Sequence, residues 1–135
     1  MRWLCGVLLS VLVAVSCGCA GQGADEGSQT TSATPLDLDE AVVADLGGGR
    51  SPRHRYLVRI GAKGRLTLRM SWNDQEGVDR VLIQGGTITD AVVVDARNQL
   101  KIEPSLEIAP GYYYVEIIPG RVPVTYNLVA LFVRS

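Results

Sequence analysis

Cysteine is absent from most of this chain. All three cysteines, Cys5, Cys17 and Cys19, stand among the first 19 residues. The rest of the sequence can therefore form neither a disulfide nor a thiolate metal site. A domain built from it must be stabilised by a hydrophobic core, and roughly 100 residues are enough to bury one.

Histidine and excess charge are also scarce. The single histidine, His54, lies in a polar run between Arg53 and Arg55, which predicts a solvent-exposed side chain. Because few nucleophile–base pairs remain, we expect no enzyme activity and no cofactor. The net charge of −1 argues against nucleic acid as a partner.

The first residues resemble an export signal. Arg2 precedes an apolar run of 13 residues, 3–15, which is shorter than the roughly 20 that span a bilayer. Ala14-Val15-Ser16-Cys17-Gly18-Cys19 then resembles a bacterial lipobox, whose cysteine thiol accepts a lipid. The resemblance implies a signal peptide over 1–16 and lipidation at Cys17, with Cys19 as the alternative. An ordinary secretory signal that is cleaved near these residues remains open.

The segment after the cysteines has no large apolar residue between Ala20 and Pro35. Such a composition cannot bury enough surface to fold, so we expect 17–35 to be a flexible tether. Neither Cys17 nor Cys19 is followed by Asp, which in lipoproteins of double-membraned bacteria resembles an inner-membrane retention signal. The resemblance therefore implies a cell-envelope location, on the outer membrane.

The remainder, 36–135, is patterned for β-strands. Apolar residues alternate with polar ones in 55–60 and most cleanly in 65–72, which is typical of half-buried strands. Further short apolar runs are separated by Gly, Pro and Asn; they lie at 78–83, 91–94, 100–102, 106–108, 112–117 and 125–132. We predict an all-β domain of about eight short strands, an antiparallel, jelly-roll-like β-sandwich.

The last strands resemble a known family. Gly111-Tyr112-Tyr113-Tyr114-Val115-Glu116-Ile117, followed by Tyr126-Asn127-Leu128, is similar to the end of the bacterial pre-peptidase C-terminal domain. The strand at 56–60, the glycine turn at 61–64 and Leu66-Thr67-Leu68 fit the same family. The resemblance implies a β-sandwich. It also implies a binding role, since members usually follow secreted peptidases and are similar to carbohydrate- or matrix-binding modules.

Acidic side chains form a candidate calcium site. Asp74, Glu76 and Asp79, joined by the acids at 37, 39 and 40, offer hard oxygen ligands. Their spacing fits no EF-hand. Arg80 also stands beside Asp79, where the family has a second acid, so the resemblance implies no complete calcium site. We predict no bound metal.

Arginine is the most distinctive feature of the domain. Seven bases and no acid lie between Arg50 and Arg69. If 55–60 and 65–70 form a hairpin, Arg59 faces Arg65 and Arg55 faces Arg69, an unfavourable pairing of like charges. The positive charge of such a face would need to be neutralised by an anionic partner or by acids of a neighbouring strand, such as Glu116. Alternatively the two strands lie in different sheets.

Two tyrosines complete the candidate binding residues. Tyr112 and Tyr114 share a strand face with Glu116, while Tyr113, Val115 and Ile117 take the core face. Exposed tyrosines stack on sugars or anchor protein partners. The sequence thus predicts an envelope lipoprotein with a non-catalytic binding or assembly domain, attached to the membrane by lipid and bound to an unknown envelope protein or glycan. The alternatives are a carbohydrate-binding module and a secreted soluble binding domain.

Overall fold

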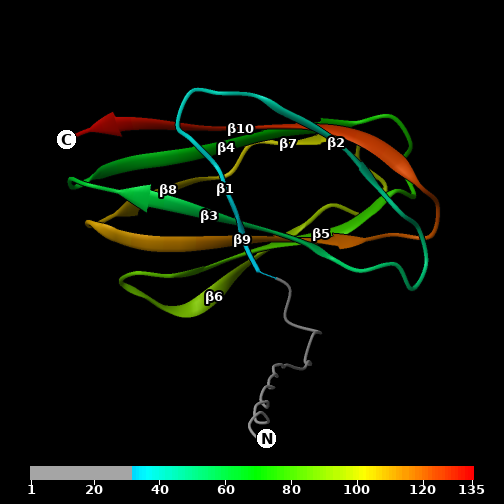
Figure 1. Ribbon diagram of the computed structural model, residues 1–135, viewed down its shortest axis with the longest axis horizontal. Coiled ribbons are helices and arrows are strands. Elements are labelled where there is room, and N and C mark those ends of the chain that lie inside the picture. The colour runs from blue at the N-terminus through cyan, green and yellow to red at the C-terminus, as the bar shows by residue number, and fades with distance from the viewer. Residues whose placement is uncertain (1–31) are drawn as a thin grey trace, which may run out of the picture. The chain divides into compact units, whose positions relative to one another are not determined.

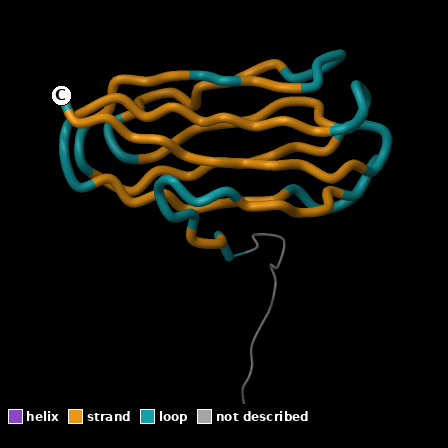
Figure 2. The backbone as a smooth tube through the Cα atoms, turned by 90° about the horizontal axis from the view of Figure 1, so that it is seen from above, coloured by secondary structure: helices purple, strands orange, loops and turns teal. Residues whose placement is uncertain are grey.

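The computed structural model describes residues 32–135, which contain β-strands, turns and loops and no helix (Figures 1 and 2). No helix suited to crossing a bilayer therefore occurs in this described range. The predicted signal peptide, the candidate lipid sites Cys17 and Cys19, and the tether as far as residue 31 lie outside the described residues.

Ten strands form two packed sheets. They are β1 (Thr34–Pro35), β2 (Val42–Leu46), β3 (His54–Ile60), β4 (Gly64–Trp72), β5 (Val78–Gly85), β6 (Ile88–Asp95), β7 (Lys101–Ile102), β8 (Ser105–Ile108), β9 (Gly111–Pro119) and β10 (Val124–Arg134). Sheet 1 has the order β1-β3-β9-β5-β6, and sheet 2 has the order β2-β10-β4-β7, with β8 also paired to β4. The predicted β-sandwich is confirmed.

The strand count exceeds the predicted eight at the start of the domain. Thr34–Pro35, which we assigned to the tether, pairs in parallel with Tyr56 and Leu57 of β3. Val42–Leu46, to which we assigned no strand, pairs antiparallel with β10. The ordered strands thus begin two residues before Leu36, the predicted start of the domain.

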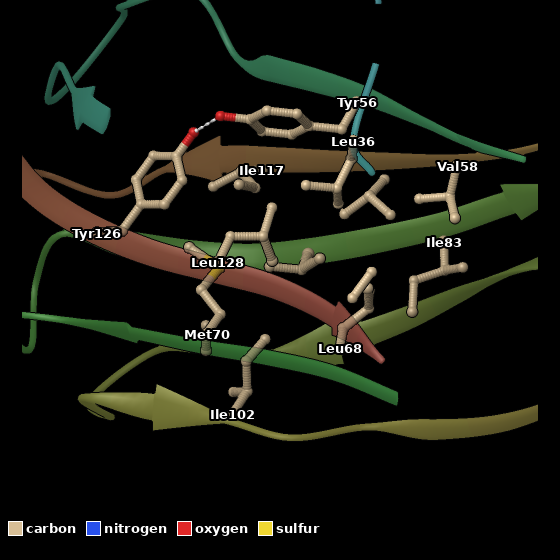
Figure 3. Packing of buried hydrophobic residues seen from close by; sticks show 14 of the residues in the cluster. Leu36, Tyr56, Val58, Leu68, Met70, Ile83, Ile102, Ile117, Tyr126 and Leu128 are labelled. Atoms are coloured by element: carbon tan, nitrogen blue, oxygen red, sulfur yellow. Dashed lines mark hydrogen bonds between the residues drawn. The ribbon is translucent and has the colours of Figure 1, made fainter. Parts of the chain in front are cut away.

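The core lies between the sheets and follows from the period-two pattern of the strands. In β9, Tyr113, Val115 and Ile117 are fully buried, as the sequence predicted. They meet the inward side chains of β4 and β10 from the other sheet, among them Met70 and Leu128 (Figure 3). Burial of each such aliphatic side chain stabilises the fold by about 1.5–3 kcal/mol.

The first ordered residues close one side of the sandwich. The Leu36 amide donates to the Leu57 carbonyl at 2.9 Å in sheet 1, and two residues later Leu38 bridges to Ala130 of sheet 2. Figure 1 shows this segment in cyan crossing between the two layers. The Leu36 side chain is 3% exposed, so the crossing segment fills the seam between the sheets with an apolar residue.

Candidate functional site

Four of the predicted binding residues share the outer face of sheet 1: Arg55, Arg59, Tyr112 and Tyr114. We call this set the tyrosine–arginine face. Tyr56, Val58 and Ile60 are buried in β3, so Arg55 and Arg59, at the alternate positions, point away from the core. Arg59 lies opposite Tyr112 in the antiparallel pairing of β3 with β9.

Arg55 is held on this face by two neighbours. Its guanidinium carbon lies 4.2 Å from the centroid of the Tyr114 ring, a distance typical of a cation–π contact. Its Nε lies 3.4 Å from Glu116 Oε2, but this buried nitrogen makes no hydrogen bond. Glu116 also accepts a hydrogen bond from Arg53 Nη1 at 3.1 Å. One carboxylate therefore serves two arginines.

Arg59 and Tyr112 are the free part of the face. Arg59 forms no ion pair with any residue from 32 to 135, and the Tyr112 side chain is 56% exposed. Among residues 32–135, Glu116 is the one acid that pairs with Arg53 and Arg55, and Arg59 pairs with none. The face therefore carries a net positive charge next to an accessible aromatic ring.

The other two predicted binding arginines, Arg65 and Arg69, lie on the other sheet. Arg65 and Arg69 belong to β4 in sheet 2. Arg65 Nη2 pairs with Glu107 at 2.7 Å, and Arg69 Nη2 pairs with Glu103 at 3.0 Å. Arg65 is thus neutralised by an acid of β8, and Arg69 by an acid of the link between β7 and β8.

The hairpin interpretation is wrong for a related reason, and the alternative is confirmed. The short turn after Ile60 carries the chain from sheet 1 to sheet 2 instead of reversing it within one sheet. Arg55 then lies opposite Glu116 and Arg65 opposite Glu107. Opposite charges thus replace the like-charge pairs that a hairpin would have created.

The acids proposed as weak calcium ligands make other contacts. Asp74 Oδ1 accepts the Glu76 amide at 2.9 Å and so caps a turn. The Glu76 carboxylate pairs with Arg121 at 3.3 Å, and Asp79 pairs with Arg80 at 3.8 Å. Within residues 32–135, no three side chains of the metal-ligating types gather at one point.

His54 is half-buried, which corrects the prediction of a solvated surface residue. Its Nδ1 lies 2.7 Å from the Tyr126 hydroxyl, which is 2.5 Å from the Tyr56 hydroxyl (Figure 3). Burial lowers the His54 pKa below 6.5, so the ring is neutral near pH 7. Burial, reinforced by the Tyr56 hydrogen bond, also raises the Tyr126 pKa. This cluster could not be predicted from the sequence, since His54 and Tyr126 are 72 residues apart.

A hollow that the sequence did not indicate lies at one end of the sandwich. It has a volume of about 220 Å³, and its lining includes Glu76, Asp79, Arg97 and Arg121. Arg121 pairs with Glu76, while Arg97 pairs at 3.1 Å with Asp95. Its arginines are thus neutralised by acids of the domain itself, which distinguishes the hollow from the tyrosine–arginine face.

Comparison with solved structures confirms the fold that the tyrosine-rich strands suggested. The pre-peptidase C-terminal domain of a collagenase from Bacillus anthracis matches with a TM-score of 0.61 and 17% sequence identity, over 73% of this chain and 94% of that domain. The chain therefore has the fold of a pre-peptidase C-terminal domain.

Two further structures are more distant. A mutant of PliG-Ec, a periplasmic inhibitor of g-type lysozyme from Escherichia coli, matches with a TM-score of 0.47 and 13% identity, over 76% of this chain and all of that one. PliG from Salmonella Typhimurium matches with a TM-score of 0.44 and 13% identity, over 72% of this chain and 98% of that one. No protein-family model and no curated protein matches the sequence.

Proposed function

We propose that this protein is a lipid-anchored protein of the bacterial envelope, whose non-catalytic β-sandwich binds another envelope component through the tyrosine–arginine face. The single observation that carries the binding role is the placement of Arg59 beside Tyr112. An arginine without an internal partner next to an exposed tyrosine is typical of the residues that dominate binding energy at interfaces.

The anchor is proposed from the sequence. Cys17 follows small residues after an apolar run of signal-peptide length, and a polar tether follows it. A lipidated Cys17 would therefore hold the domain near the membrane. Because Gly18 and not Asp follows Cys17, we propose that this is the outer membrane. A secreted, unanchored domain is the alternative.

Replacement of the two cysteines tests the anchor. We expect Cys17→Ser to move the protein from the membrane fraction to the soluble fraction and to remove the acyl mass from the mature chain. Cys19→Ser should change neither. If the double variant stays membrane-bound with an unchanged mature mass, the lipid anchor is refuted.

The chemistry of the face favours a protein partner with acidic groups. Net positive charge complements an acidic surface and makes the interaction sensitive to salt. The Arg55 guanidinium already covers one face of the Tyr114 ring, so the aromatic area open to a sugar is reduced. The carbohydrate-binding alternative rests on Tyr112, whose ring is accessible.

The binding test uses the protein with matched variants. We expect Arg59→Glu to abolish capture of a discrete envelope protein, because it reverses the one unpaired charge of the face. Arg65→Glu is the control, since Arg65 is equally basic but lies on the other sheet beside Glu107. Equal capture by wild type and Arg59→Glu would contradict the proposal. Retention on isolated envelope polysaccharide that is lost with Tyr112→Ala would instead establish the carbohydrate module.

A further inference from the structure

Strand β6 is the long open edge of the described domain. It has eight residues and pairs only with β5. The opposite edge of sheet 1 is covered by β1, which contains Pro35, and the edge strands β2 and β7 of sheet 2 have five and two residues. Short strands and prolines protect edges from further pairing. β6 has neither protection.

The free hydrogen-bonding groups of β6 can be assigned from its register. The Ala96 amide donates to the Asp79 carbonyl at 3.1 Å, and the direction of these groups alternates along an antiparallel strand. Val92 and Val94 therefore bond to β5, whereas Ala91 and Val93 direct their amides and carbonyls outward. The edge ends at Asp95, whose carbonyl accepts Gln99 Nε2 at 2.7 Å.

A hollow with an apolar part lies beside this edge, in the seam between the two sheets. It has a volume of about 400 Å³. Val94 of sheet 1 and Ile102 and Pro104 of the sheet 2 side form the apolar part of its lining, and the polar part consists of Asp95, Gln99, Lys101 and Glu103. On the outer face of β6, Val93 is 60% exposed. A strand added to β6 would therefore find apolar contacts on both of its faces.

The opposite seam shows how this protein closes such a gap. There the extended segment that contains β1 pairs with β3, and the next residue, Leu36, is buried between the sheets. The seam beside β6 offers the same two elements, an edge with free backbone groups and an apolar gap. Within residues 32–135 no segment occupies it, because β6 ends the order of sheet 1.

We propose that β6 binds an extended segment of a partner protein, which adds a strand to sheet 1 and places apolar side chains into the hollow. Main-chain hydrogen bonds give the affinity in this mode of recognition, and alternate side chains give the specificity. Asp90 makes no ion pair with any described residue, so a basic residue in the partner segment would complement it.

A second copy of the chain fits this edge less well. Asp95 of β6 is paired with Arg97, but Asp90 has no ion pair within residues 32–135. A β6–β6 ribbon would therefore bring two unpaired Asp90 carboxylates into one edge, and β6 contains no base to balance them. The chain's own tether also lacks the required chemistry, because Ala20 to Pro35 contains no large apolar residue to fill the hollow. A partner strand with a basic residue to pair with Asp90 and apolar residues to fill the hollow meets both requirements.

The test places a photo-cross-linking amino acid at Ala91 in the intact protein, expressed in a host with its own envelope. We expect one discrete heterologous adduct. Val93→Pro should reduce its yield roughly tenfold or more, because proline removes an outward donor and blocks an added strand. Val93→Thr keeps the donor and is the matched control. The same amino acid at Val133, which is 69% exposed on β10, should give no such adduct.

Each outcome decides the proposal, provided that thermal unfolding shows both Val93 variants to be folded. Loss of the adduct in Val93→Pro with retention in Val93→Thr supports strand addition. No adduct, an adduct that survives Val93→Pro, or an adduct between two copies of the chain overturns it. The proposal uses a surface separate from the tyrosine–arginine face. If Arg59→Glu leaves capture unchanged while the Ala91 cross-link is lost in Val93→Pro, that combination refutes only the proposed function of the tyrosine–arginine face and supports strand addition to β6.

Discussion

Replacement of Tyr126 by Phe removes the central group of a buried hydrogen-bonded chain. The Tyr126 hydroxyl lies 2.5 Å from the Tyr56 hydroxyl and 2.7 Å from His54 Nδ1. The ring of Tyr126 is fully buried, so phenylalanine keeps the packing and deletes only the oxygen. The Tyr56 hydroxyl is then left buried without its partner. We expect Tyr126→Phe to lower the free energy of unfolding by about 1–3 kcal/mol.

The Tyr56→Phe variant provides the internal comparison. It removes one of the two hydrogen bonds but leaves the Tyr126 hydroxyl bonded to His54, so the expected loss is smaller, about 1 kcal/mol. The double variant should lose less than the sum of the two single losses, because the Tyr56–Tyr126 bond is counted in both. The order of the losses follows from the central position of Tyr126.

Urea unfolding at about pH 8, where His54 is neutral, measures these differences. Trp72 is 6% exposed in the folded protein, so its fluorescence should report the transition. An equal or larger loss for Tyr56→Phe would refute the hydrogen-bonded order described here. Strict additivity in the double variant would refute the bond between the two hydroxyls.

Three other predictions concern titration and packing. Burial lowers the His54 pKa below 6.5, so the unfolded state binds more protons than the folded state at pH values between the lowered pKa and 6.5. The free energy of unfolding should therefore fall as the pH drops below 6.5. His54→Gln should flatten this pH dependence in urea unfolding, and an unchanged slope would contradict the prediction. Hydrogen bonds from Arg97 lower the Asp95 pKa to about 2, so Arg97→Ala should move the NMR titration midpoint of that carboxyl up towards 3.8, and an unmoved midpoint would argue against the pair. Leu36→Ala should cost about 2–5 kcal/mol in chemical unfolding, whereas Leu100→Ala, at a side chain that is 46% exposed, should cost far less; equal costs would show that the seam is not part of the core.

The sequence predicted the local features of the fold because they depend on neighbouring residues. Alternation in β4 and β9 identified their inward side chains, and burial of Leu66, Leu68, Tyr113 and Val115 agrees with that pattern. Turns rich in Gly, Pro and Asn separated the strands at nearly the observed positions. These signals depend on residues that are close together in the sequence, so one amino-acid sequence is enough to detect them.

Partners that are distant in the chain could not be predicted in this way. The turn between β3 and β4 is short enough for a hairpin, and alternation is the same whether two strands share a sheet or face each other across the core. Only the pairing of β3 with β9 brings Arg59 beside Tyr112 and separates both from Arg65. The composition of the candidate site was visible in the sequence, but its division between two sheets was not.

The order of the strands has a consequence for how this chain is made. The two last strands are interior to their sheets, since β9 lies between β3 and β5, and β10 lies between β2 and β4. Until residues 111–134 have emerged, from a ribosome or an export channel, neither sheet can be completed. Folding dominated by such contacts between distant residues is slow. The domain should therefore stay unfolded until β9 and β10 are both available for pairing, so its folding follows the synthesis of these two strands instead of accompanying the synthesis of the earlier ones.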